Sequence, residues 1–160
     1  MKHLKLFENF TEENTLSVEG ILKRKEYAND VIEDIKTISY LLEEEGFELK
    51  YQFAIPYGDG LVNYFEIEDY NRLTNDIFVT SQKELKVIMI DSIVVKVIGN
   101  TITNPRTFQN SLSEDKLKSV ERYINLLKEH LDYINPHNIS QGRSLMGNIN
   151  IIIKLPFHTF

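Results

Sequence analysis

The chain has 160 residues, a formal net charge of −6 and no cysteine. Without cysteine it can form neither disulfide bonds nor thiolate metal sites. No apolar run in the sequence is long enough to cross a membrane as a helix. Acidic side chains outnumber basic ones most strongly in the first fifty residues. This argues against nucleic-acid binding over a broad surface, because such binding depends on Lys and Arg neutralising phosphates.

Residues 1–14 differ in composition from the rest of the chain. We expect them to form an N-terminal arm beside a single domain over residues 15–160. The arm carries four apolar side chains, Leu4, Leu6, Phe7 and Phe10, ahead of a polar stretch. It could be a short amphipathic helix or a flexible segment. In either form, these apolar side chains are candidates for docking on a partner protein.

The domain is expected to begin with a weakly alternating edge strand over residues 16–23 and a solvated basic turn at residues 23–25. A helix is then predicted from Asn29 or Asp30, either of which suits the N-cap, to Gly46, which suits the position past the end. Its apolar residues recur at steps of three and four and share one face: Ala28, Val31, Ile32, Ile35, Ile38 and Leu42.

Residues 47–55 alternate between apolar and polar side chains, which predicts a strand with one buried face. Pro56 ends this strand. The turn at residues 57–60 leads into a second strand over residues 61–67, so the pair is predicted to be a hairpin.

Three further strands are predicted in the middle of the chain, at residues 77–79, 83–90 and 93–98. The last two could instead be one long bent strand over residues 85–98. Residues 101–109 show no periodicity and are expected to form a loop.

A second helix is predicted from the capping-box pair Ser111 and Glu114 to Asn135-Pro136, which stop it. Its apolar residues step regularly along one face: Leu117, Val120, Ile124, Leu127, Leu131 and Ile134. We expect this face to pack on a sheet, and the alternative is a homo-oligomer formed through it. A polar loop over residues 135–147 and a strand over residues 149–155 complete the chain.

Together these elements predict an α+β fold. Two main helices should cover one face of a mostly antiparallel sheet, which makes a two-layer sandwich. The strand over residues 47–55 is expected to lie under both helices, with its apolar face toward them.

The polar loop is the most site-like stretch of the chain. It contains His137 and Arg143, of which the arginine suits an anionic group; the simpler interpretation is a surface loop. Glu66 and Glu68 are expected on one side of a strand, where their carboxylates could hold a magnesium ion. Otherwise we expect no metal, because no two histidines have the HxH or HExxH spacing of a zinc site. We expect no cofactor, because the sequence has no glycine-rich phosphate-binding motif.

The order of elements gives a resemblance to the PD-(D/E)xK nucleases. Asp59 lies near the predicted hairpin, and Glu84-Leu85-Lys86 lies on a later strand. The resemblance implies metal-dependent phosphodiester cleavage, with Asp59 and Glu84 as metal ligands and Lys86 positioning the attacking water. The chain departs from the family's pattern because Glu84 starts its strand instead of lying within it.

Residues 1–10 (MKHLKLFENF) and residues 35–47, ending in LEEEGF, resemble small proteins of tailed bacteriophages. The resemblance implies a phage-encoded protein located in the host-cell cytoplasm or in the virion. Since no catalytic motif stands out, the sequence favours a non-enzymatic module that binds another protein. The alternative is the metal-dependent nuclease.

Overall fold

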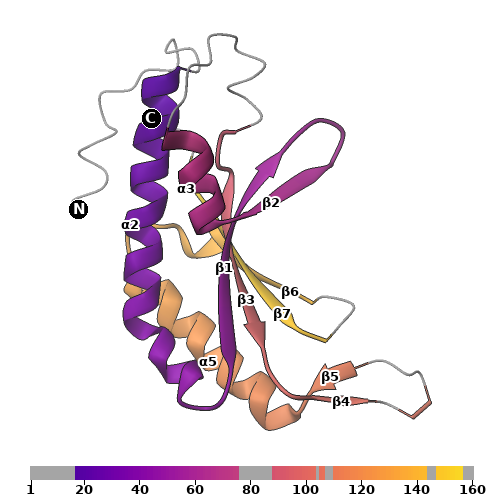
Figure 1. Ribbon diagram of the computed structural model, residues 1–160. Helices are drawn as coiled ribbons and strands as arrows, with labels where there is room; N and C mark the ends of the chain where they lie inside the picture. Colours follow the sequence, from indigo (N-terminus) through magenta and orange to yellow (C-terminus); the bar gives the residue numbers. More distant parts are fainter. Residues whose placement is uncertain (1–16, 76–87, 104, 107–109, 144–146, 157–160) are drawn as a thin grey trace.

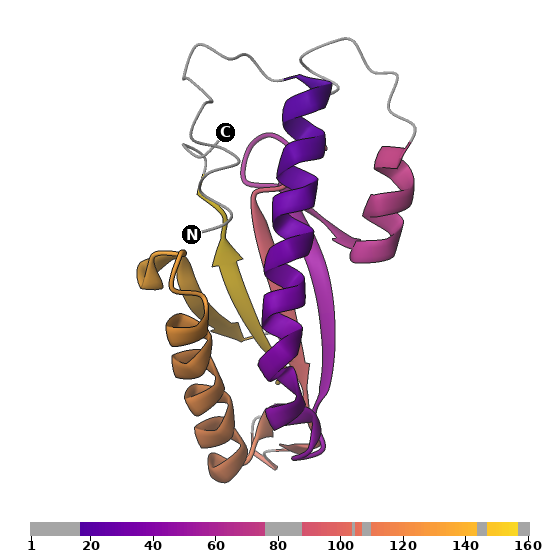
Figure 2. The ribbon, with the colours of Figure 1, turned by 90° about the vertical axis from the view of Figure 1, so that its left-hand side faces the viewer.

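The computed structural model describes residues 17–75, 88–103, 105–106, 110–143 and 147–156. Its main sheet has five antiparallel strands in the order β2 (Val62–Glu66), β1 (Glu48–Pro56), β3 (Ser92–Ile98), β7 (Ile149–Lys154) and β6 (Ile139–Arg143). A second, two-stranded sheet joins β4 (Thr101–Thr103) and β5 (Asn110–Leu112). Three helices, α2 (Val18–Glu43), α3 (Ile67–Asn75) and α5 (Glu114–His130), lie on one face of the main sheet (Figures 1 and 2). The predicted α+β class is confirmed.

Helix α2 begins well before the predicted start. Ser17 is its N-cap, and the Ser17 hydroxyl accepts a hydrogen bond from the Gly20 amide at 3.0 Å. The strand predicted over residues 16–23 and the turn at residues 23–25 are therefore wrong. The buried row of α2 runs through Ile21, Arg24 and Ala28 at helical spacing. Because a charged arginine occupies a buried position in this row, the sequence shows no regular apolar period there.

Arg24 has only 1% of its surface exposed. Its guanidinium donates hydrogen bonds to the backbone oxygens of Ile90, Leu155 and Pro156. Burial lowers the pKa of Arg24 to about 9, while the nearby charge of Asp91 opposes that shift. The side chain ties the first half of α2 to the segments that border β3 and β7.

Strand β1 has the predicted face toward the helices. Phe53 and Ile55 are fully buried, whereas Glu48 and Lys50 are exposed. Gly46, with φ of 90°, makes the tight turn from α2 into this strand. Helix α2 lies in front of β1, and α5 lies beside α2 on the side of β7 (Figure 2).

The chain turns directly from β2 into α3, a helix that the sequence pattern did not predict. Tyr70 of α3 is fully buried. Its ring meets Phe53 edge-on at a centroid distance of 5.1 Å and Phe65 at 6.1 Å. The helix buries only Tyr70 and Thr74, which are too few to produce a visible apolar period.

The middle of the chain follows the prediction only in part. Strand β3 is confirmed, but residues 88–91 are not strand, which excludes one continuous strand over residues 85–98. The strand predicted at residues 77–79 lies outside the described residues, as do residues 83–87 of the strand predicted over residues 83–90. Strand β4 lies within residues 101–109, which were expected to form a loop, and β5 lies where the second helix was expected to begin.

Helix α5 is capped by Ser113 instead of Ser111, and it ends at His130, earlier than predicted. Its apolar face nevertheless lies in the core together with two residues beyond the helix end. The buried members of the predicted row are Val120, Ile124, Leu127, Leu131 and Ile134. Because Leu117 is the only partly buried member, this row cannot serve as the surface of a homo-oligomer.

The predicted polar loop over residues 135–147 is wrong for most of its length. A short 3-10 helix, η1 (Pro136–Asn138), leads into the edge strand β6. Ser140 of β6 pairs with Ile152 of β7. An edge strand accepts polar residues because it contacts only one neighbouring strand, so its composition resembles that of a loop.

Candidate binding surface

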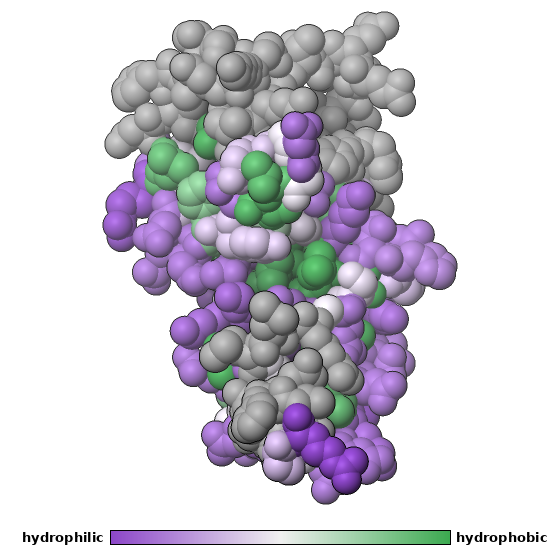
Figure 3. Space-filling view, turned by 90° about the vertical axis from the view of Figure 1, so that its right-hand side faces the viewer, coloured by the Kyte–Doolittle hydropathy of each residue, from purple (hydrophilic) through white to green (hydrophobic). Residues whose placement is uncertain are grey.

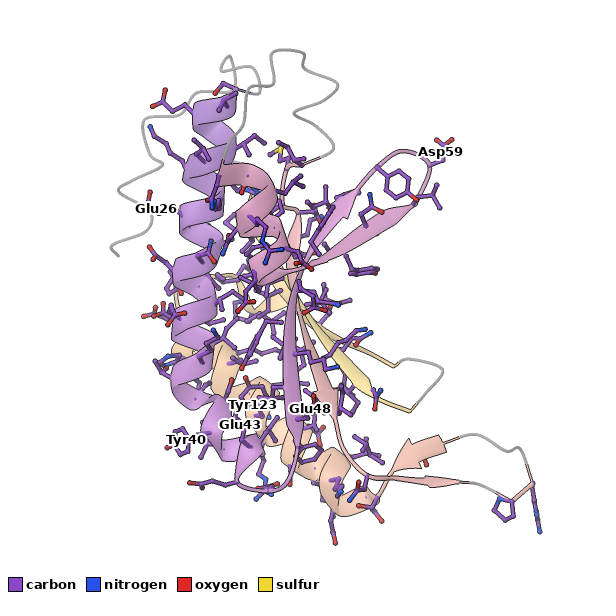
Figure 4. All side chains as sticks on the ribbon, in the orientation of Figure 1. Glu26, Tyr40, Glu43, Glu48, Asp59 and Tyr123 are labelled. Carbon is purple, nitrogen blue, oxygen red and sulfur yellow. The ribbon has the colours of Figure 1, made fainter. Side chains whose placement is uncertain are left out.

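The hairpin of β1 and β2 projects from the body of the molecule, with Asp59 at its tip (Figures 1 and 4). Gly58 and Gly60 have φ of 71° and 78°, a region that glycine enters without strain. The Tyr57 amide donates to the Leu61 carbonyl at 2.9 Å, and the Leu61 amide donates to the Gly58 carbonyl at 2.9 Å. These bonds give the hairpin a defined turn.

Apolar side chains are exposed along this hairpin. The exposed fractions are 41% for Tyr57, 54% for Leu61, 38% for Val62 and 58% for Tyr64. The other well-exposed large apolar side chains in the described part of the chain are spread over three helices: Leu22, Tyr40, Leu73 and Leu126. Apolar surface is visible on the face from which the hairpin projects (Figure 3). Clustered exposed apolar surface is typical of an interaction site.

Strand β2 is an edge strand of the described sheet. The Asp91 amide donates to the Ala54 carbonyl at 2.9 Å, so the backbone polar groups of Ala54 face β3. Ala54 pairs with Tyr64, and backbone groups alternate in direction along an antiparallel strand. The N–H and C=O groups of Val62, Tyr64 and Glu66 therefore face away from β1, toward the free edge.

The surroundings of this edge are acidic. Asp59 lies at the hairpin tip and Glu66 at the other end of β2, while Glu68 and Asp69 occupy the first turn of α3. The sequence has no Lys or Arg between Lys50 and Arg72. Arg72 lies 4.0 Å from Asp69 in an exposed ion pair, which has little strength in water. A cationic ligand would therefore meet a favourable potential here.

Glu66 and Glu68 do not lie on one strand, as the predicted magnesium site required. Glu66 ends β2, where its Oε1 accepts a hydrogen bond from Gln52 Nε2 at 2.7 Å, but Glu68 belongs to helix α3. The prediction that they share one side of a strand is wrong, because the chain turns into α3 at Ile67. Within the described residues, no group of three His, Asp or Glu side chains could hold a metal ion.

The structure describes only one of the three residues in the nuclease hypothesis. Asp59 is exposed at the hairpin tip, whereas Glu84 and Lys86 lie outside the described residues. The predicted docking side chains of the arm, Leu4, Leu6, Phe7 and Phe10, also lie outside them.

His137 lies in η1, before the start of β6, and Arg143 lies at the end of β6. His137 is exposed in η1, and its amide donates to Asn135 Oδ1 at 3.0 Å. Arg143 is the last residue of the strand and pairs with Ile149. A strand rises roughly 3.3 Å per residue, so the five residues of β6 keep these two positions apart. Their contribution to a binding site stays a prediction.

A hollow lies between the C-terminal end of α2 and helix α5. Its volume is about 270 Å³, and its walls include Leu42, Ser119, Arg122 and Leu126. Arg122 already donates a hydrogen bond to the Ser119 hydroxyl at 3.2 Å. This hollow is smaller than typical small-molecule sites, and an adjoining hollow of about 600 Å³ has mostly charged walls, which include Glu45, Asp115 and Lys118. Because small-molecule sites are lined mainly by apolar side chains, the hairpin is the stronger candidate.

No protein-family model, curated protein or solved structure matches this chain. In the described residues no helix has the length and apolar character needed to span a membrane. The class of the protein is thus defined by its own architecture, an α+β sandwich with an apolar, acid-flanked hairpin at one sheet edge.

The sequence pattern predicted the hairpin but not its exposure. One signal was present: Leu61, Val62, Tyr64 and Phe65 put apolar side chains on both faces of β2. Phe65 packs against Tyr70, whereas Leu61, Val62 and Tyr64 stay well exposed in the described structure.

Proposed function

We propose that this protein is a non-enzymatic module that binds another protein through the β1–β2 hairpin. The observation that carries the proposal is the concentration of exposed apolar side chains on a projecting hairpin whose outer strand has no second neighbour among the described strands. Such an edge can accept an extended segment of a partner by strand addition. In this mode backbone hydrogen bonds supply affinity, and alternate side chains supply specificity.

The charges around the hairpin favour a partner segment with basic residues. Asp59 and Glu66 flank the apolar stretch, and the sequence has no Lys or Arg between Lys50 and Arg72 to neutralise them. Electrostatic complementarity of this kind increases the association rate and suppresses wrong partners.

Site-specific photocrosslinking tests the proposal. A photoreactive phenylalanine would replace Tyr64 in one variant and Tyr40 in a matched control. These tyrosines are exposed to similar extents, 58% and 52%, but Tyr40 lies on α2, away from the hairpin. We expect a discrete adduct with one other protein from position 64 and none from position 40. The same adducts from both positions, or none from position 64, would contradict the proposal.

The finer predictions from the sequence stay proposals. We infer a phage-encoded protein, in the host-cell cytoplasm or the virion, only from the resemblance of residues 1–10 and 35–47. The identity of a crosslinked partner would test it, because a phage structural protein or a host protein would be distinguished by mass spectrometry.

A further inference from the structure

We propose that the face of the main sheet opposite the helices, the open face, binds a small hydroxylated anion of the sugar-acid or sugar-phosphate class. The described helices all lie on the other face of the sheet (Figure 1). The site is formed by β1, β3, β7 and β6. It leaves out the exposed apolar side chains of the hairpin, so the inference goes beyond the proposed function.

The register of the sheet places two lysines side by side on the open face. Lys50 of β1 is directly opposite Lys96 of β3. Their chain neighbours Tyr51 and Val95 pack in the core, and side chains alternate between the two faces of a strand. The Cβ atoms of such a pair lie roughly 5 Å apart, and like charges in this position destabilise a sheet.

The positive charge of this pair is only partly compensated. Lys50 forms an exposed ion pair with Glu48 at 3.9 Å, which has little strength in water. Lys96 is half-buried, and within the part of the chain that the structure describes it has neither an ion pair nor a side-chain hydrogen bond. An anion bound between the two ammonium groups would remove their repulsion.

Two buried acceptor atoms near Lys96 have no hydrogen-bond partner in the described structure, Gln52 Oε1 and Asn150 Oδ1. Asn150 is directly opposite Lys96, and Gln52 is a diagonal neighbour of Lys96. The amide nitrogen of Gln52 already donates to Glu66 at 2.7 Å, so only its oxygen is unpaired. Buried polar atoms are nearly always paired in folded proteins. A ligand that carries O–H donors would supply the bonds that these two oxygens lack.

The surroundings of the two oxygens leave room for a ligand. Gly142 of β6 is directly opposite Asn150, and a Cβ atom at Gly142 would have no neighbour within 4 Å. The side chains next to the two oxygens in the register are Lys50, Lys96, Val94 and Ile152. Lysine side chains are long and flexible, so ammonium groups that turn toward a bound anion would also uncover the oxygens.

This combination of groups defines the chemistry of the ligand. A carboxylate or phosphate group suits the two ammonium groups, and hydroxyl groups suit the amide oxygens. An inorganic anion supplies only the charge, and a neutral sugar supplies only the hydroxyls. A sugar acid or sugar phosphate supplies both. Neighbouring strands lie roughly 4.8 Å apart, which is the scale of one sugar ring.

An NMR titration of the isotope-labelled, full-length protein tests the inference. The probes are glucuronate, glucose 6-phosphate, glucose and inorganic phosphate. We expect at least one of the two sugar anions to shift the amide signals of Lys96 and Asn150 with a Kd below about 1 mM. Glucose and inorganic phosphate should bind at least about tenfold more weakly. The tighter of the two sugar anions shows whether the site prefers a carboxylate or a phosphate.

Three variants locate the site. Lys96→Gln removes one charge of the pair, and Gly142→Val fills the space beside Asn150, so each should weaken binding at least about tenfold. Lys154→Gln is the matched control, because Lys154 is an exposed lysine of the same face that lies opposite Ser92. It should change the Kd by less than about twofold. Lys96→Gln should not lower the Tm, because it removes a like-charged neighbour.

Three results would overturn the inference. Neither sugar anion shifts the signals of Lys96 and Asn150 at about 10 mM, or inorganic phosphate binds as tightly as the sugar anions. The third result is an equal loss of binding in Lys96→Gln and Lys154→Gln. The titration uses no protein partner, so its outcome is independent of whether crosslinking supports the proposed function.

Discussion

The hydroxyl of Ser39 on α2 lies 2.8 Å from the hydroxyl of Tyr123 on α5. The Tyr51 hydroxyl of β1 donates to the same Ser39 oxygen at 2.9 Å, and Ser39 donates to the Ile35 carbonyl at 2.9 Å. The Ser39 hydroxyl donates its only proton to the Ile35 carbonyl. The hydroxyls of Tyr51 and Tyr123 therefore both donate to the Ser39 oxygen. One buried hydroxyl therefore joins two helices and the sheet.

Ser39→Ala should destabilise the fold by roughly 1–3 kcal/mol, because it leaves the buried hydroxyl of Tyr123 and the half-buried one of Tyr51 without their acceptor. Urea unfolding with an unchanged slope would measure the loss. Thr37→Ala is the matched control on the same helix, since the Thr37 hydroxyl forms its bonds at the exposed surface. Its cost should stay within about 0.5 kcal/mol, and equal losses for both variants would contradict the role assigned to Ser39.

Tyr123 should also make stability depend on alkaline pH. Burial raises the pKa of Tyr123 above its ordinary value of 10.0, although the hydrogen bond with Ser39 opposes this shift. A group whose pKa is raised by folding stabilises the protein fully below its unfolded pKa, and this contribution is lost as pH rises toward the folded value. The wild type should therefore be about 1 kcal/mol more stable to unfolding than Tyr123→Phe at pH 8. This difference in stability should shrink above pH 10.

The control for this titration is Tyr40→Phe, which changes an exposed phenol on α2. Its stability should lie within about 0.5 kcal/mol of the wild type at pH 8. A constant stability difference between the wild type and Tyr123→Phe from pH 8 to pH 11 would show that the Tyr123 phenol titrates alike in the folded and unfolded chains.

The sequence was sufficient for the fold class because its longest elements have clear periods. Strand β1 alternates strictly, and α5 has a regular apolar row. The missed elements lack such periods for physical reasons. Arg24 occupies a core position of α2 as a hydrogen-bonded cation, α3 has only Tyr70 and Thr74 to bury, and the edge strand β6 needs few apolar residues.

The candidate site could be predicted only in part. The glycines at positions 58 and 60 indicated the turn, and the composition of residues 61–65 indicated a strand. Neither observation reveals that β2 lies at the edge of the sheet. The sheet extends from the other side of β1 through β3 and β7, which lie far along the chain. The prediction for Glu66 and Glu68 failed for the same kind of reason, since the helix after β2 depends on Tyr70 packing against Phe53.

Phe53→Ala should destabilise the protein by roughly 3–5 kcal/mol, the usual cost of truncating a buried aromatic side chain. Phe53 is fully buried and meets Tyr70 edge-on, so the truncation would also remove support for α3. Tyr40→Ala, at an exposed position, should cost less than about 0.5 kcal/mol. Chemical denaturation compares the two variants, and a loss below about 1 kcal/mol for Phe53→Ala would place that ring outside the core.

Gly99 lies directly after β3, where two side chains of the core leave no room for a methyl group. A Cβ atom at this position would lie 2.8 Å from Phe47 Cε1 and 3.0 Å from Leu112 Cδ2. Both neighbours are buried, so they cannot move aside freely. Gly99→Ala should therefore cost roughly 1–3 kcal/mol, as expected for overpacking.

Gly142 provides the matched control, because a Cβ atom there has no neighbour within 4 Å and the residue lies in the edge strand β6. Gly142→Ala should be neutral or stabilise the protein by up to about 1 kcal/mol, since alanine restricts the unfolded chain more than glycine does. Thermal or urea unfolding of both variants separates the steric cost from this backbone effect. If Gly99→Ala were as stable as Gly142→Ala, the ring of Phe47 would have to occupy a different position, and the close packing of β3, β5 and the start of β1 would be wrong.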